Sequence, residues 1–241
     1  MGITAIVFDM DDTLYPEKDY VLSGFKAVSD RVFNQFGYLG FYELAEKLFA
    51  SGEHRLIFNR VLDQLGISYD HQLVSELVAC YRTHEPEIQL SADALCLLNR
   101  MNSKVKLGLL SDGYIEAQEQ KLLKLNLQHR FHAVVLSDAF GREHWKPSPV
   151  PYEHVVRLLQ VKHDECVYVG DNASKDFITA KALGWRTVRL KRPDGVYADT
   201  PVPEEFEAHY QIDSLIELTT IEELQHLFCR GVELEPEVKV G

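Results

Sequence analysis

The chain has 241 residues and carries 37 Asp and Glu against 25 Lys and Arg, which gives a formal net charge of −12 at pH 7. Hydrophobic residues make up 46% of the sequence, enough for a folded core, and the acidic balance argues against sequence-independent binding to nucleic acid, which needs a basic surface. No run approaches the roughly 18 consecutive apolar residues of a membrane-spanning helix.

The N-terminus lacks the basic and then apolar pattern of an export signal. The four cysteines are scattered and form no C-x-x-C pair. We therefore expect a reduced, cytoplasmic protein without a disulfide framework or a cysteine zinc site. The sequence leaves the oligomeric state open.

Short apolar runs with the composition of buried strands recur along the chain. The first is 3–8, and the others are 105–110, 133–136, 166–169 and 187–190. Helical patterns separate the later runs. Strands that alternate with helices predict an α/β fold, here a Rossmann-like parallel sheet with right-handed crossovers. In such a sheet the ligand lies beyond the carboxyl ends of the strands.

The alternation is interrupted between the first two runs. Residues 17–86 contain several helical stripes, such as Phe25, Val28 and Val32, and no convincing strand. Prolines at both joints suit domain linkers. We predict a core domain formed by 1–16 and 87–228, a helical domain inserted at 17–86, and a loose C-terminal tail at 229–241.

Polar residues follow four of the apolar runs. They are Asp9-Met10-Asp11-Asp12-Thr13, Ser111-Asp112-Gly113, Lys146-Pro147 and Gly170-Asp171-Asn172 with Asp176. Several carboxylates at one edge of a sheet repel one another unless a cation joins them. Oxygen ligands without His or Cys favour Mg²⁺, which commonly bridges carboxylates to a phosphate. The ion and Lys146 would supply the local positive charge that an acidic chain needs to bind an anionic substrate.

The spacing of Asp9 and Asp11 suggests a reaction. In an extended chain, residues i and i+2 point to the same side. One carboxylate can then attack phosphorus while the other protonates the leaving oxygen and later activates water.

These motifs, in this order, resemble those of the haloacid dehalogenase superfamily over about residues 3–190, and the insert resembles its type 1 helical cap. The resemblance implies that Asp9 is the nucleophile and Asp11 the general acid/base. It implies that Ser111, with Asp112 and Gly113, binds the phosphoryl group. A single Asp after a strand is, however, often only a turn or cap residue.

The resemblance further implies that Lys146 stabilises the developing charge and that Mg²⁺ is held by Asp9, Asp171 and the backbone carbonyl of Asp11. Asp176, with Asn172 beside it, would support the site by orienting Lys146 or the metal's surroundings. One departure is Asp12, which stands where the superfamily commonly has Gly. A second is the stretch from Ser137 to Lys146, which is longer than the usual form.

We therefore expect a Mg²⁺-dependent phosphatase that acts on a small phosphorylated metabolite, such as a sugar phosphate or a nucleotide-like ester. A phosphomutase needs the same carboxylates and stays open. A dehalogenase needs neither a metal nor an acid at Asp11, and a non-catalytic regulator would not need Asp9 and Asp11 together. Polar residues of the insert could reach the leaving group, although most such residues are only solvated; the candidates are Glu17, Tyr20, Arg31, Arg55 and Asn59.

Overall fold

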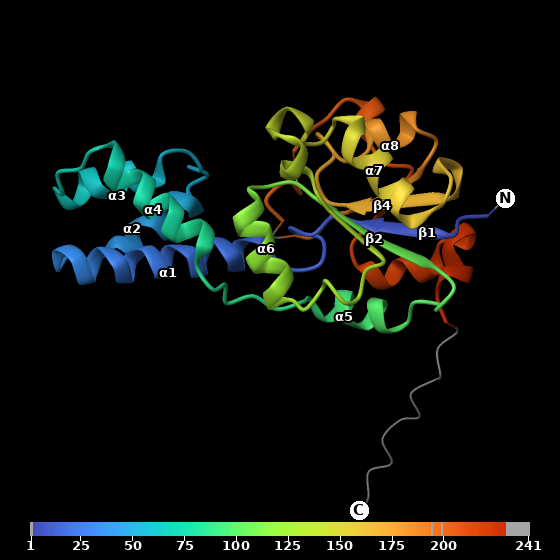
Figure 1. The fold of residues 1–241 in the computed structure, drawn as a ribbon, viewed down its shortest axis with the longest axis horizontal. Coiled ribbons are helices and arrows are strands. Elements are labelled where there is room, and N and C mark those ends of the chain that lie inside the picture. The colour runs from blue at the N-terminus through green and yellow to red at the C-terminus, as the bar shows by residue number, and fades with distance from the viewer. Residues whose placement is uncertain (1, 194, 199, 230–241) are drawn as a thin grey trace, which may run out of the picture.

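The computed structural model describes residues 2–193, 195–198 and 200–229 (Figure 1). Its centre is a six-stranded parallel sheet in the order β3-β2-β1-β4-β5-β6. The strands are β1 (Ala5–Phe8), β2 (Lys106–Ser111), β3 (Ala133–Leu136), β4 (Cys166–Gly170), β5 (Arg186–Leu190) and β6 (Tyr210–Ile212). The predicted α/β fold with a parallel sheet is confirmed. The sequence did not indicate β6, which has three residues at the sheet edge, two of them exposed.

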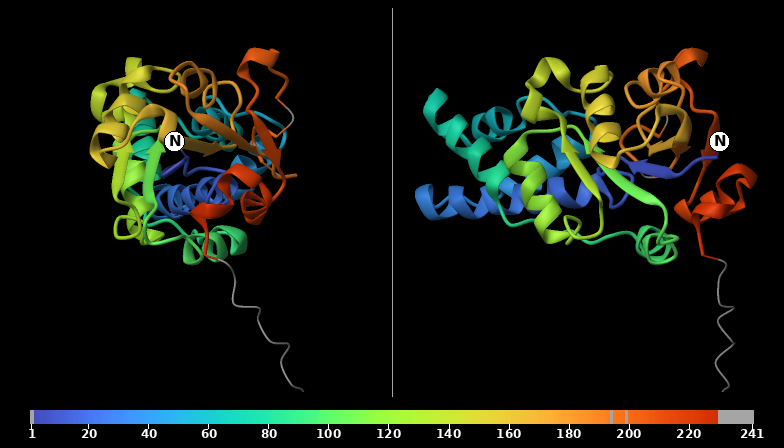
Figure 2. Two further views of the ribbon diagram at one scale, coloured as in Figure 1. Left: turned by 90° about the vertical axis from the view of Figure 1, so that its right-hand side faces the viewer. Right: turned by 45° about the vertical axis from the view of Figure 1, so that its right-hand side comes forward.

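Helices cover both faces of the sheet, as Figures 1 and 2 show. α5 (Ala92–Asn99) and α6 (Ile115–Lys124) contribute to the core on one face, and α7 (Pro149–Leu159) and α8 (Ile178–Ala182) to the core on the other. Strand β1 supplies both cores, because Ile6 and Phe8 point to the first face and Ala5 and Val7 to the second. All four residues are fully buried, as expected for a central strand of a parallel sheet.

The connections also contain short 3₁₀ helices. Two of them lie between Ser137 and Lys146, where the sequence indicated an unusually long approach to the lysine. The 3₁₀ helices are η1 (Ser137–Phe140), η2 (Arg142–His144), η3 (His163–Glu165), η4 (Glu204–Phe206), η5 (Leu215–Thr220) and η6 (Glu222–Leu227).

Four helices lie to one side of the sheet, at the left of Figure 1. They are α1 (Glu17–Phe36), α2 (Phe41–Ala50), α3 (Ile57–Leu65) and α4 (His71–Thr83), which we call the helical insert. The insert has an apolar core of its own, with Val28, Val61 and Leu77 fully buried. The predicted helical stripes therefore pack against one another. The exact domain boundaries stay a prediction.

Among the described residues, no helix is both long and apolar enough to cross a membrane. Apart from Cys229, the predicted C-terminal tail lies outside the described residues.

Candidate active site

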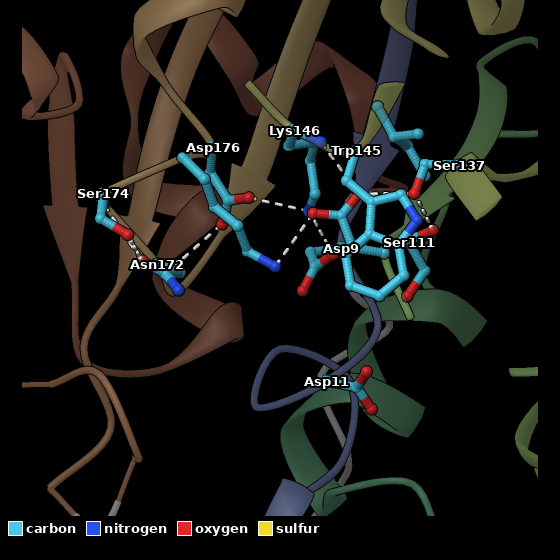
Figure 3. Close-up of polar contacts among 12 residues, drawn as sticks. Asp9, Asp11, Ser111, Ser137, Trp145, Lys146, Asn172, Ser174 and Asp176 are labelled. Carbon is cyan, nitrogen blue, oxygen red and sulfur yellow. Dashed lines mark hydrogen bonds and ion pairs between the residues drawn. The ribbon is translucent and has the colours of Figure 1, made fainter. Parts of the chain in front are cut away.

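The polar residues at the strand ends meet at one edge of the sheet. Phe8, the last residue of β1, is in register with Leu109 of β2 and Val169 of β4. The parallel strands therefore end side by side, and their extensions bring Asp9, Ser111 and Asp171 to the same edge. Figure 3 shows Asp9 and Ser111 there, with Lys146 reaching in from the loop after β3.

Lys146 is the centre of a buried hydrogen-bond group. Its Nζ donates to Asp9 Oδ1 at 2.6 Å, to Asp176 Oδ1 at 2.8 Å and to the hydroxyl of Tyr168 at 2.8 Å. Burial opposes the charge, but Asp176 and Asp9 outweigh it and raise the pKa of Lys146 above its usual value. The ammonium is therefore a fixed positive charge beside Asp9. This geometry agrees with the expectation that Asp176 orients Lys146.

Three buried carboxylates form a cluster next to this lysine. Asp9, Asp171 and Asp176 each offer an oxygen, and these atoms lie within 4.8 Å of one another. Burial raises the pKa of Asp9 to about 7, against the opposing effect of Lys146. Burial and the charges of Asp176 and Asp9 also raise the pKa of Asp171.

The three carboxylates of this cluster are not all paired with positively charged or hydrogen-bonding groups. Asp176 is paired with Lys146, and its Oδ2 accepts the backbone N–H of Asn172 at 3.0 Å. Within the part of the chain that the structure describes, no hydrogen-bond donor reaches the Asp171 carboxylate. A buried, unpaired carboxylate beside two others is costly unless a cation joins them. The oxygen-only donor set fits a hard divalent ion such as Mg²⁺.

Asp11 lies apart from this cluster. Its carboxylate accepts hydrogen bonds from Lys121 Nζ at 2.7 Å and Gln118 Nε2 at 2.9 Å, and from the Tyr15 hydroxyl. Burial opposes ionisation, but Lys121 and Gln118 outweigh it and hold the pKa of Asp11 below its usual value. In Figure 3 the Asp11 side chain stands away from the group formed by Asp9 and Lys146.

Asp9 and Asp11 both line the cavity described below, but a different lysine holds each carboxylate, Lys146 for Asp9 and Lys121 for Asp11. β1 ends at Phe8, and the backbone turns at residues 12–14, after both carboxylates. Leu14 donates its N–H to the carbonyl of Met10 at 2.9 Å, which closes this turn.

The backbone conformation and the side-chain contacts of Asp12 explain why this position can hold a residue other than Gly. Its φ of 52° is in the left-handed region, which Asp adopts more readily than most residues. Its side chain accepts the backbone N–H groups of Glu17 at 2.7 Å and Val196 at 2.8 Å. Asp12 thus ties the turn after β1 to the first residue of α1 and to the loop that follows β5.

Each residue of the Ser111-Asp112-Gly113 segment has different contacts. The Ser111 hydroxyl is buried and accepts a hydrogen bond from Gln118 Nε2 at 3.2 Å. Gly113 has a φ of 132°, and a Cβ there would lie 2.5 Å from Gln118. Only glycine therefore fits at this position without rearrangement.

Asp112 is occupied by contacts that hold the lysine loop. Its Oδ1 accepts the Ser137 hydroxyl at 2.6 Å and the Lys146 backbone N–H at 3.1 Å, while Oδ2 pairs with Lys175 at 3.1 Å. Burial opposes ionisation, but Lys146 and Lys175 outweigh it and lower the pKa of Asp112. These contacts support a positioning role for a residue that the sequence indicated as phosphate-binding.

A cavity of about 740 Å³ extends from this edge of the sheet toward the helical insert. Asp9, Asp11 and Asp171 line one end of it. Of the polar candidates in the insert, Glu17, Tyr20 and Asn59 also line the cavity, whereas Arg31 and Arg55 do not. Arg31 instead pairs with Glu76 at 2.6 Å.

Several residues near the reactive carboxylates were not identified from the sequence. They are Tyr15, Gln118, Lys121, Tyr168 and Lys175. Only Tyr168 had a sequence signal, because it lies in β4 two residues before the strand's last residue, Gly170. The positions of Gln118 and Lys121 depend on how α6 packs beside the turn after β1.

Comparison with known proteins shows the family of this chain. Residues 6–190 match the family described as haloacid dehalogenase-like hydrolase, which covers well over half of the chain. The chain belongs to this family. The predicted superfamily is therefore confirmed, and the chain is a hydrolase.

The relatives include phosphatases and dehalogenases. A glyceraldehyde 3-phosphate phosphatase from Methanopyrus kandleri is 31% identical over 230 residues, which cover 91% of this chain and 97% of the relative. A magnesium-bound HAD-hydrolase from Bacillus subtilis has a similar fold, with a TM-score of 0.67, 19% identity, and coverage of 92% of this chain and 99% of that one. A 2-haloacid dehalogenase from Pseudomonas syringae shares the fold at a TM-score of 0.61, with 21% identity and coverage of 90% and 97%. The name of the first relative agrees with the predicted phosphatase activity.

Proposed function

We propose that this hydrolase cleaves a small-molecule phosphate monoester through an aspartyl-phosphate intermediate and depends on Mg²⁺. The observation that carries the proposal is the buried cluster in which Asp9 contacts the Lys146 ammonium and lies beside the unpaired Asp171 carboxylate. Buried charges in fixed positions are suited to phosphoryl transfer, which depends mainly on positioning and electrostatic stabilisation.

In the first step, an oxygen of Asp9 attacks phosphorus and the bond to the leaving oxygen breaks. The electron pair goes to the leaving oxygen, which takes a proton from Asp11. Lys146, already in contact with Asp9, stabilises the negative charge that spreads over the phosphoryl oxygens. Ser111 and the backbone beside Gly113 hold those oxygens.

In the second step, water attacks phosphorus and gives its proton to the Asp11 carboxylate. The bond between phosphorus and Asp9 breaks, which restores the Asp9 carboxylate and releases inorganic phosphate. Asp11 must exchange its contact with Lys121 for contacts with the leaving oxygen and the attacking water in these two steps.

Asp9, Asp171 and the backbone carbonyl of Asp11 are the proposed holders of Mg²⁺. When bound, the ion supplies positive charge that offsets the carboxylates and attracts a phosphate oxygen. The magnesium-bound B. subtilis protein of the same fold supports this proposal.

We propose that the helical insert is a cap that covers the cavity and selects the leaving group. The relative that acts on glyceraldehyde 3-phosphate supports a small phosphorylated metabolite as the substrate. The dehalogenase neighbours offer the main alternative, but halide leaves without a proton and would give Asp11 no role. A phosphomutase would use the same carboxylates and differs in keeping water from the intermediate.

The proposal is tested by phosphate release from p-nitrophenyl phosphate and a panel of metabolite phosphates, with Mg²⁺ or with EDTA. We expect turnover only with the metal, none in Asp9→Asn, and a loss of about 10²- to 10⁴-fold in Asp11→Asn. The exposed Asp63→Asn is the matched control and should retain full activity. Full activity in Asp9→Asn, or release of halide from a haloacid by the wild type, would overturn the proposal.

A further inference from the structure

The cavity has two chemically different ends. At the sheet edge it is lined by charged groups, among them Asp9, Asp171 and Lys175. At the helical insert most of its wall is apolar, and we call the following six residues the apolar wall: Val21, Phe25, Phe49, Phe58, Val74 and Val78. The two ends belong to one continuous space, so a molecule bound at the charged end extends toward the apolar wall.

The aromatic rings of the wall are held in place by one another. The ring centroids of Phe25 and Phe49 are 6.1 Å apart, and those of Phe25 and Phe58 are 6.3 Å apart, both in edge-to-face contact. Phe58 also contacts Tyr81 edge-on at 5.7 Å. The wall is therefore a preformed surface, because ring pairs in this geometry are mutually stabilising.

The wall is the side of the insert's apolar core that lines the cavity, and Val21 and Phe25 belong to both. The interior is filled by fully buried side chains such as Val28, Val61 and Leu77. Phe49, Phe58, Val74 and Val78 are only partly buried and keep surface toward the cavity. Apolar surface that faces water gains free energy when an apolar group covers it, in proportion to the area buried.

The wall would serve a hydroxyl-rich leaving group poorly. Beyond the first turn of α1, the polar side chains that the insert offers to the cavity are few, chiefly His54, Asn59 and Arg82. Sugar hydroxyls placed against Phe49, Phe58 or Val78 would lose water without gaining partners. A three-carbon ester would leave most of the 740 Å³ unfilled, since sites of roughly 300–1,000 Å³ suit much larger ligands.

We propose that the preferred substrate is an amphipathic phosphate monoester, whose leaving group is an aryl or alkyl body larger than three carbons that packs on the apolar wall. This inference rests on the proposed phosphatase function and names its substrate class. It separates this chain from the relative that acts on glyceraldehyde 3-phosphate.

The first test compares kcat/KM for ethyl, butyl and hexyl phosphate with Mg²⁺, together with glyceraldehyde 3-phosphate. The three alkyl leaving groups have similar intrinsic reactivity, so the trend reports binding to the cavity. We expect kcat/KM to rise about two- to fourfold for each methylene that is buried. Hydrolysis of ethyl phosphate or glyceraldehyde 3-phosphate with no gain, or a loss, for the longer chains would overturn the inference and leave the phosphatase proposal intact.

The second test alters the apolar wall in two ways. Val78→Thr places a hydroxyl where a methyl group stood, and Phe58→Ala removes a ring. Both should flatten the dependence of kcat/KM on chain length. Phe33→Ala, at an exposed position of α1 that does not line the cavity, should keep the full dependence. An unchanged dependence in Val78→Thr and Phe58→Ala would contradict the proposed contact.

A binding measurement separates this inference from the proposed function. Ethyl- and hexylphosphonate carry a phosphorus–carbon bond that the proposed reaction does not cleave, and calorimetry gives their affinities directly. We expect the wild type to bind hexylphosphonate at least tenfold more tightly, and Phe58→Ala to lose most of this difference. Equal affinities would overturn the inference, whereas the absence of any ester hydrolysis would overturn the phosphatase proposal and, with it, the substrate class that rests on it.

Discussion

Lys121 of α6 donates a 2.7 Å hydrogen bond to the carboxylate of Asp11, and both side chains are largely buried. The same ammonium lies 4.2 Å from the ring centroid of Tyr20, on the first turn of α1. Lys121 therefore connects the proposed general acid/base to the helical insert. Because it also lowers the pKa of Asp11, it acts on the group whose proton the leaving oxygen requires.

Replacing Lys121 with Met should raise the pKa of Asp11. Burial already opposes ionisation of this carboxylate, and the substitution removes the largest opposing effect. Asp11 acts as an acid in its protonated form, so a higher pKa extends that form to higher pH. We expect the alkaline fall of kcat/KM for an alkyl phosphate to begin at higher pH.

The matched control is Lys124→Met on the same helix, whose lysine forms a more exposed pair with Glu85 at 3.1 Å. Its pH profile should coincide with that of the wild type. A shift of equal size in both variants would show that charge on α6 in general, and not the contact with Asp11, sets the profile.

Asp12 should contribute more to folding stability than its turn position suggests. Asp12→Ala loses two hydrogen bonds and keeps a left-handed backbone that Ala disfavours, so we expect a loss of about 2–4 kcal/mol in the free energy of unfolding. Asn126→Ala provides the control, since Asn126 is exposed and has a φ of 51°. It should cost about 1 kcal/mol. Equal losses in denaturant titrations would mean that the hydrogen bonds to Glu17 and Val196 add nothing.

Much of the fold and part of the site followed from the sequence. Buried apolar runs such as β1 and β4 are recognisable, and a parallel sheet places the residues after them at one edge, so Asp9, Ser111 and Asp171 could be grouped. The partner of Asp11 could not be predicted, because Lys121 is 110 residues away and approaches through the packing of α6.

Substitutions at Lys146 and Tyr168 measure how much the buried hydrogen-bond group contributes to the free energy of unfolding. Tyr168→Phe removes one of three partners of the ammonium and should lower the free energy of unfolding by about 1 kcal/mol. Lys146→Met leaves Asp9 and Asp176 without their cation and should cost about 3–5 kcal/mol in the metal-free protein.

Lys26→Met, which breaks an exposed pair with Glu87, is the control for removing a lysine and should leave the free energy of unfolding nearly unchanged, because water screens an exposed pair. Urea titrations of the four proteins measure the differences. If Lys146→Met lowered the free energy of unfolding no more than Lys26→Met does, the buried lysine would not be the charge that compensates the carboxylate cluster.

Asp171→Asn should have opposite effects on the metal-free and the Mg²⁺-loaded protein. The pKa of Asp171 is raised by burial and by its acidic neighbours, so its contribution to stability is present below its usual value of 3.8 and is lost as pH rises through the raised pKa. At neutral pH the substitution therefore removes a carboxyl group whose ionisation the folded protein disfavours, and it should raise the Tm of the metal-free protein.

With Mg²⁺ we expect the wild type to have a higher Tm than Asp171→Asn. An ion that binds only the folded state stabilises it by about 2.7 kcal/mol at 100 times its Kd, and Asp171→Asn removes a proposed ligand. We expect Mg²⁺ to raise the Tm of the wild type and of the exposed control Asp213→Asn, but not that of Asp171→Asn. Thermal unfolding with Mg²⁺ and with EDTA measures both effects. An equal Mg²⁺ response in all three proteins would place the ion away from Asp171, and a lower Tm for metal-free Asp171→Asn would show that this carboxylate is already compensated within the chain.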